Sequence, residues 1–203
     1  MTSEVHLELK LLGGFEARLQ AGAALVLPTQ KTQALLAYLA LPLGQSHPRE
    51  KLATLLWGDM QHTQARGNLR NALSRIKKIL PKPVRASLVV DGASVSLDPT
   101  AVDVDVARFE RLLADGSTEA LGQIAALYRG ELLAGLVLSE RPFEEWLTAE
   151  RVRLHELAIQ GLGRLFALSA AGWRSRGGRS DRSSSSRAGR APGACAPRRH
   201  VAL

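Results

Sequence analysis

The order of hydrophobic patterns after residue 28 constrains the fold more than any other feature of this sequence. Three successive stretches carry apolar residues at the steps of three and four that are typical of amphipathic helices. Each has its own start signal, because Thr29 and Thr63 can cap a helix and Pro48 suits the first helical position. The third stretch runs to Leu80, where a proline follows. We therefore expect three consecutive helices.

A two-stranded hairpin is expected directly after these helices, over residues 88–97. Asp91-Gly92 favours a type I′ turn, in which both central residues have positive φ. Val95 and Leu97 alternate with serines, as in a half-buried strand. Three helices followed by a ribbon is the order of a winged helix-turn-helix, with the hairpin as the wing.

Strands are expected before this segment and helices after it. Apolar–polar alternation predicts a small antiparallel meander of strands over 5–11, 15–19 and 25–27. Residues 103–172 have helical patterns throughout, with Asp105 as an N-cap and the aromatic residues of the last helix in the core. The predicted fold class is α+β: a winged helix-turn-helix with a small antiparallel sheet and a wing hairpin, followed by an all-α tetratricopeptide-like domain.

The charge is unevenly distributed along the chain. All 203 residues together have a net charge of +8, which suggests an anionic partner, either nucleic acid or a membrane surface. Residues 1–100 hold 12 basic and 7 acidic side chains, residues 101–172 hold 7 and 11, and residues 173–203 hold 8 and 1. The last segment is rich in Arg, Ser and Gly and poor in aliphatic residues, so we expect it to be disordered. These three ranges are the predicted DNA-binding domain, helical domain and tail.

Other function classes lack their signatures in this sequence. Cys195 is the only cysteine, so neither an intrachain disulfide nor a thiolate zinc site is expected, which fits a reducing cytoplasm. No signal-peptide pattern is present, and no apolar run reaches the roughly 20 residues of a membrane-spanning helix. Phosphate-loop, dinucleotide-binding and nucleophile-elbow motifs are absent. We therefore expect a cytoplasmic protein with no membrane partner, no enzymatic activity and no metal or cofactor.

The helix expected over 65–80, after its Thr63 cap, has a basic face without any acidic residue. No Asp or Glu occurs between Gln61 and Leu80. Arg can pair with guanine O6 and N7, Asn can pair with adenine N6 and N7, and a helix of this kind fits the major groove of double-stranded DNA. The alternative is a plain solvated basic face, which is common on helices. The predicted recognition residues are Arg66, Asn68, Arg70, Asn71, Ser74, Arg75, Lys77 and Lys78.

Weaker candidates surround this helix. Backbone N–H groups at helix N-termini favour phosphate, and basic side chains lie near two such starts. The wing turn is expected to touch the DNA backbone or the minor groove. Each of these residues is more often a plain surface group. The candidates are Lys31, Arg49 and Lys51 near the helix starts and Asp91, Gly92 and Ser94 in the wing.

Two blocks of the sequence resemble one bacterial family. Residues 33–80, with QALLAYLAL, REKLATLLWGD and ARGNLRNALSRIKKIL, resemble the OmpR-type winged-helix domain of the Streptomyces antibiotic regulatory protein family. Residues 103–154, with DVDVARFERLL, LYRGELLAGL and PFEEWLTAERVRL, resemble the bacterial transcriptional activator domain that follows it in that family. The resemblance implies an activator that binds direct repeats near promoters, with a homodimer on the repeats as one arrangement, and that helps to recruit RNA polymerase.

The resemblance extends to single residues, with departures. The family's recognition block maps onto Arg66, Asn68, Leu69, Arg70 and Arg75. Gln33 stands where a basic residue is common, and Gly67 stands where a second polar residue is usual, which weakens the helix by about 1 kcal/mol relative to Ala. In the family the second domain continues through further helices, whereas here LGRLFALSAAG gives way to the tail. We expect a truncated or out-of-frame end, with a basic tail that adds non-specific DNA affinity as the alternative.

Two function classes therefore remain open. The first is a sequence-specific DNA-binding transcriptional regulator that works through helix 65–80. The second is a helical protein–protein interaction module with only weak, non-specific DNA binding, in which the acidic helical half is the working part.

Overall fold

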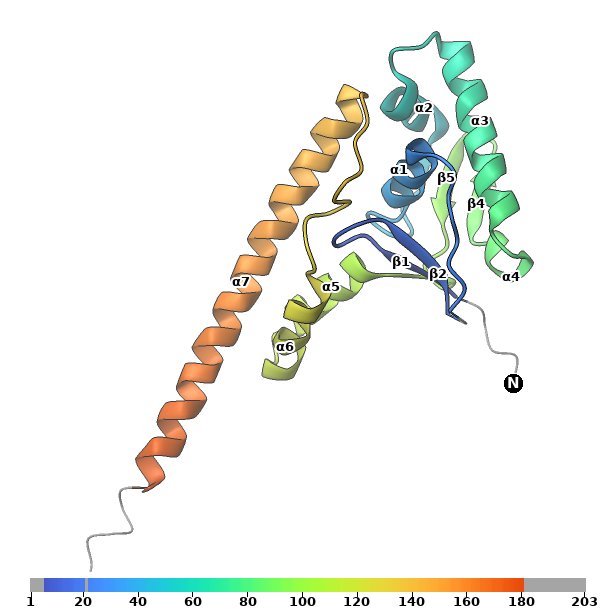
Figure 1. Cartoon of the computed structure of the whole chain (residues 1–203). Coiled ribbons are helices and arrows are strands. Elements are labelled where there is room, and N and C mark those ends of the chain that lie inside the picture. The colour runs from blue at the N-terminus through green and yellow to red at the C-terminus, as the bar shows by residue number, and fades with distance from the viewer. Residues whose placement is uncertain (1–5, 21, 181–203) are drawn as a thin grey trace, which may run out of the picture. The chain divides into compact units, whose positions relative to one another are not determined.

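A computed structural model of the chain describes residues 6–20 and 22–180 (Figure 1). Of these, the residues up to Phe166 form one compact unit and those from Ala167 belong to a second. The predicted α+β class is confirmed, because a winged helix-turn-helix with two small sheets is followed by helices. The elements in chain order are β1 (Leu7–Lys10), β2 (Glu16–Leu19), α1 (Gln30–Leu39), β3 (His47–Pro48), α2 (Arg49–Trp57), α3 (His62–Ile79), α4 (Lys82–Arg85), β4 (Leu88–Asp91), β5 (Ser94–Leu97), β6 (Val102–Val104), α5 (Asp105–Asp115), α6 (Thr118–Leu127) and α7 (Arg141–Ser180).

Helices α1, α2 and α3 build the core of the N-terminal half. Thr29 caps α1 as predicted, since its hydroxyl accepts a bond from the Thr32 N–H and the Thr32 hydroxyl accepts one from the Thr29 N–H. Helix α1 is buried on most sides and packs against both α2 and α3. The predicted cap Thr63 is wrong: the chain leaves the extended conformation at Gln61, so α3 begins at His62 and Thr63 already lies inside its first turn.

The predicted wing hairpin is confirmed, but its turn type is wrong. Strands β4 and β5 remain paired as far as Asp91 and Ser94, so the turn consists of Gly92 and Ala93. Neither turn residue has positive φ, which a type I′ turn would need and which Ala adopts only with strain. Strand β3, which the sequence patterns did not predict, pairs with β5 and joins the wing to the start of α2.

The first sheet is mixed rather than purely antiparallel. Strand β1 lies between β2, which is antiparallel to it, and β6, which is parallel. The predicted strand over 25–27 is wrong, because these residues join no sheet and Val26 is 80% exposed; a single bridge links Arg18 to the preceding Ala24. Instead, β6 brings the buried Val102 and Val104 beside β1. A fragment that ended at residue 100 would lack this strand.

Asp105 fastens α5 to the first sheet instead of capping the helix. Val104 occupies the N-cap position, so the predicted N-cap role of Asp105 is wrong. The Asp105 carboxylate accepts hydrogen bonds from the N–H groups of Leu11 at 2.8 Å and Leu12 at 2.9 Å, just past the end of β1. Burial raises the pKa of Asp105, although these two donors and Arg129 oppose the rise. The carboxylate satisfies backbone donors that would otherwise be buried without partners.

Helices α5 and α6 form the expected hairpin, and α7 packs against both. Gly116 ends α5 in the left-handed conformation, with φ of 66°, and Ser117 caps α6. A Cβ atom on Gly161 of α7 would lie 2.5 Å from Leu113 Cδ2 of α5 and 3.3 Å from Ile124 Cδ1 of α6. The three helices therefore approach closely here, and a larger residue at position 161 would displace the end of the Leu113 side chain.

Helix α7 begins in the core and continues further than the sequence predicted. Phe143 is fully buried, and the Trp146 ring lies 4.8 Å from the Tyr38 ring of α1, so these two aromatic residues belong to the core as expected. The same prediction is wrong for Phe166, which is 77% exposed because it lies at the end of the part of the helix that packs against the core. The helical backbone extends to Ser180, where residues 173–180 were expected to be disordered. The composition of residues 173–180 argues against a packed core. A helix that is already formed can continue without such a core, because each added residue adds one backbone hydrogen bond. Residues 181–203 lie outside the described part of the chain.

Candidate nucleic-acid interface

Helix α3 presents a continuous polar face opposite its buried stripe. The stripe packs against α1 and α2 and thereby fixes the rotation of the helix. Of the eight predicted recognition residues, six are exposed, and Asn68 and Lys77 are half-buried. Lys77 and Lys78 lie in the last turn, where the helix dipole favours cations. The buried stripe consists of Ala65, Leu69, Ala72, Leu73 and Ile76.

One side of this face, which we name the wing flank, borders a groove of about 410 Å³ between α3 and the wing. Cationic side chains from α2, α3 and α4 line the groove, and Leu73 and Val90 form its apolar part. No acidic side chain lines it, and none of its cations forms an ion pair with another residue in the described ranges. Unpaired like charges converging on one groove create a positive potential that favours a polyanion. The polar residues of the wing flank are Arg49, Arg70, Ser74, Lys77, Lys78 and Arg85.

Arg85 of the wing flank was missed by the sequence analysis. Its Nε donates a hydrogen bond to the Leu80 carbonyl at 3.2 Å, which holds the side chain across the end of α3. The short helix α4 turns the chain immediately after Pro81 and carries Arg85 back toward the groove. The available signal was that Lys82 and Arg85 continue the basic run beyond the proline that was taken as its end.

The wing turn lies beside the same flank, nearer the start of α3. A second groove of about 750 Å³ is lined by Gly92 and Ala93 of the turn together with side chains of α2 and α3, among them Arg49 and Arg70. The Arg49 N–H donates to the Ala93 carbonyl at 2.9 Å, which fixes the turn against α2. Of the three predicted wing residues, only Gly92 lines this groove. Asp91 is exposed at the end of β4, and Ser94 pairs with Pro48.

The acid that is missing from the sequence of α3 is supplied by α2. Glu50 Oε1 accepts a hydrogen bond from Arg66 Nε at 2.5 Å and also pairs with Nη2, while Glu50 Oε2 lies 2.5 Å from His62 Nε2. The hydrogen bond from Arg66 is the largest of the effects that lower the pKa of Glu50. Arg66 is therefore already paired, although it belongs to the predicted recognition set. Sequence reasoning missed the pair because Glu50 and Arg66 are 16 positions apart.

The other side of the face, which we name the α1 flank, consists of Lys31, Asn68, Asn71 and Arg75. These residues line a groove of about 240 Å³ together with Trp57 and the capping threonines of α1. Lys31 forms an ion pair with Glu140, which precedes α7, and its Nζ lies 5.5 Å from the centre of the Trp57 ring. Glu140 is 8% exposed, and its Oε2 has no hydrogen-bond partner among the described residues. The Lys31 ammonium, a predicted phosphate contact, is thus already neutralised.

Lys51 lies apart from both flanks. Its Nζ is 5.9 Å from the centre of the Tyr38 ring, and it lines none of the three grooves along α3. The neighbouring His47 is buried, and its ring centre lies 5.0 Å from that of Tyr38 with the ring planes tilted by 55°. Burial, assisted by the Lys51 charge, lowers the pKa of His47. The structure therefore places Lys51 beside an aromatic cluster rather than beside the recognition helix.

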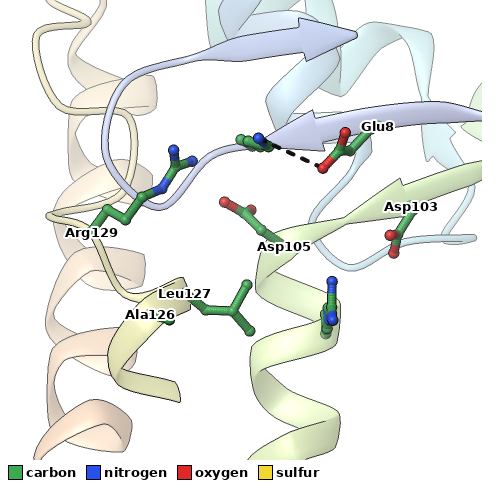
Figure 2. Close-up of a pocket in the computed structure, with 8 residues that line it drawn as sticks. Glu8, Asp103, Asp105, Ala126, Leu127 and Arg129 are labelled. Carbon is green, nitrogen blue, oxygen red and sulfur yellow. Dashed lines mark ion pairs between the residues drawn. The ribbon is translucent and has the colours of Figure 1, made fainter. Parts of the chain in front are cut away.

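A further polar pocket of about 250 Å³ lies where β1, β6, α5 and the end of α6 meet (Figure 2). Asp105 and Arg129 point toward its centre, and Glu8 pairs with Lys10 at 3.8 Å along β1. Both Asp105 oxygens already accept backbone hydrogen bonds. The arrangement therefore serves the junction between the first sheet and α5.

Residues 6–20 and 22–180 contain neither a metal-binding cluster nor a membrane-spanning helix. In these ranges, no three His, Cys, Asp or Glu side chains come together as a metal site. No helix there has the length and apolar content needed to span a bilayer.

Comparison with known proteins supports the fold. Neither the family models nor the curated proteins that were compared with the sequence gave a match. Among solved structures, the chain is similar to Mycobacterium tuberculosis EmbR, which was solved in complex with a low-affinity phosphopeptide. The TM-score is 0.59 and the identity 22%, over 88% of this chain and 52% of the EmbR chain. The two proteins share a fold, and this chain spans about half the length of EmbR.

Proposed function

We propose that this chain is a sequence-specific DNA-binding transcriptional regulator that places α3 in the major groove of double-stranded DNA. The wing flank is the observation that carries the proposal, because five cations from three helices converge on one groove without any acidic lining residue. A polyanion of regular spacing satisfies such a cluster, since each neutralised phosphate releases counterions. The exposed side chains of α3 add the donors that base recognition requires.

In this arrangement, positioning and reading are carried out by different residues. Arg49, Lys77, Lys78 and Arg85 contact phosphates, and the Gly92 turn follows the DNA backbone beside Arg49. The outward-facing residues of α3 read base edges. Arg70 is the principal candidate, because it lines both grooves on the wing side and has no ion pair with any residue in the described ranges.

The regulatory role rests on the resemblance to the Streptomyces antibiotic regulatory proteins and on the fold shared with EmbR. We infer an activator that binds promoter repeats, as a homodimer where two sites adjoin, and that contacts RNA polymerase. Residues 101–172 carry 7 basic and 11 acidic side chains, which suits a protein partner better than DNA.

Binding of the full chain to two duplexes at several salt concentrations tests the proposal. One duplex is selected from a random library, and the other is random. We expect a preference of at least about 10³-fold for the selected duplex and a linear fall of log affinity with log salt. The variant R108A is the control, since it removes an exposed arginine from α5, away from α3. Equal binding of both duplexes contradicts the proposal.

A protein–protein interaction module is the second candidate, and α7 provides its supporting observation. Val152, Ile159, Leu162 and Phe166 are exposed along this helix, and Phe166 is 77% exposed. Apolar side chains that gather on a surface mark interaction sites. The double variant I159S/F166S tests this candidate: loss of promoter activation with DNA binding intact assigns the helix to a protein partner, and retained activation excludes it.

A further inference from the structure

Glu50 is the one acidic residue among those that line the three grooves along α3. It belongs to the first turn of α2, next to Arg49 of the wing flank, and its side chain is 49% exposed. A carboxylate at this place repels the phosphates that the surrounding cations attract. Its presence on a DNA-binding surface therefore calls for a compensating role.

The geometry of the Glu50–Arg66 pair suggests what this role is. Both contacts to Arg66 use the same carboxylate oxygen and engage Nε and Nη2, which is one edge of the guanidinium. The second oxygen engages His62 in the first turn of α3. Of the five guanidinium donors, those on Nη1 and the outer hydrogen of Nη2 remain free. The free edge of Arg66 is thus held in a defined orientation near the start of α3.

We infer that Glu50 is a specificity-determining positioning residue, which orients Arg66 toward a guanine edge in the major groove and disfavours its use on phosphate. This inference rests on the proposed DNA-binding function. A fixed arginine fork matches guanine O6 and N7, whereas a free arginine can neutralise the phosphate of any sequence. Glu50 gives up some general affinity and gains discrimination at one base pair.

The contrast with Arg70 supports this assignment. Arg70 lines the same 750 Å³ groove as Arg66 but has no ion pair with any residue of the described part. The two arginines lie one turn apart on the same helix and differ in how their guanidinium groups are held. That of Arg66 is fixed by a carboxylate, and that of Arg70 is not. A pair that served only to stabilise α3 would leave base preference unchanged when it is removed.

The variants E50Q and E119Q, in the full chain, test the inference. E50Q keeps the shape of the side chain and removes its charge, and E119Q removes the same charge from an exposed position in α6. On random duplex we expect E50Q to bind more tightly than the wild type, with the slope of log affinity against log salt steeper by about 0.9. On the selected duplex we expect no such gain, so that discrimination at one G·C pair falls about tenfold.

A double-mutant cycle with R66A identifies the route of the effect. If Glu50 acts through Arg66, E50Q changes discrimination in the wild type and leaves it unchanged in the R66A background. The inference is overturned if E50Q and E119Q behave alike, or if E50Q keeps the full preference at every base pair. A wild-type chain that shows no preference at all overturns the proposed function as well, which separates the two failures.

Discussion

The two flanks of α3 carry similar side chains and differ in what these side chains already bind. On the wing flank, the cations converge on one groove and form no ion pair with any residue of 6–20 or 22–180. On the α1 flank, Lys31 is paired with Glu140, and the Asn68 amide lies 3.1 Å from the Met60 sulfur. An ion pair must be broken before its cation can contact a phosphate. The comparison teaches that the availability of a basic residue depends on its partners as well as on its exposure.

Removal of the phosphate contacts on the wing flank is expected to give the largest effect. In the triple variant K77Q/K78Q/R85Q, the slope of log affinity against log salt should decrease in magnitude by about 2.7, since each phosphate contact contributes about 0.9. The loss should be similar for selected and random duplexes, because phosphates carry no sequence information. Binding titrations at four or five salt concentrations measure the slope.

The matched control for this variant lies on the α1 flank. K31Q should leave the slope unchanged, because Glu140 already neutralises Lys31. Thermal unfolding of both variants checks that the fold is retained. The distinction between the flanks would be lost if K31Q changed the salt slope by as much as each substitution in the triple variant does.

The second prediction compares two arginines that point to different flanks. R70A should cost about 1–3 kcal/mol on the selected duplex and relax preference at one base pair. R75A, on the α1 flank, should cost about 1 kcal/mol, because fewer unpaired cations surround it. Affinities for duplexes with single base-pair changes separate the two. Equal losses on all sequences would assign either arginine to a phosphate.

The sequence predicted the parts of the fold that depend on local pattern. The periodic apolar stripe of α3 and the Thr29 cap both followed from neighbouring residues, and so did the hairpin of β4 and β5. The predicted turn type of the wing and the predicted N-caps Thr63 and Asp105 were wrong. Each of these predictions depends on the single residue at which strand pairing ends or a helix begins. Asp105 was assigned to its own helix, whereas its carboxylate binds Leu11 and Leu12, more than 90 positions away.

The candidate site was predictable as a set of side chains but not as a set of partners. The basic face of α3 is visible in the sequence because no acid lies within the helix. Glu50, Glu140 and Arg85 come from other elements, and only the packing of α2, α4 and the segment before α7 brings them to α3. Contacts of this kind follow from tertiary structure and leave no periodic signal.

The third prediction is that E140Q makes the α1 flank more like the wing flank. The Lys31 ammonium would lose its ionic partner and become available to a phosphate, so the salt slope should steepen by about 0.9. The free energy of unfolding should fall, because the pair is mostly buried and the Lys31 ammonium would lose its partner. The double variant E140Q/K31Q should restore the original slope. An E140Q slope identical to that of the wild type would show that Lys31 does not reach the DNA.

The smallest expected effect concerns the Glu50–Arg66 ion pair, which lies in the groove beside the wing turn. The pKa of Glu50 should lie below its usual value of 4.5, chiefly because Arg66 donates to the carboxylate, with a smaller contribution from His62. A lowered pKa means that the pair stabilises the fold above pH 4.5, and that this contribution disappears as the pH falls through the folded value.

Titration of the Glu50 carboxyl carbon by NMR measures the value directly. R66A should return it most of the way toward 4.5, and H62A should return it less, whereas R70A should leave it in place. A wild-type midpoint at or above 4.5 would mean that Arg66 is not held by Glu50, and that Arg66 is as free to bind phosphate as the cations of the wing flank.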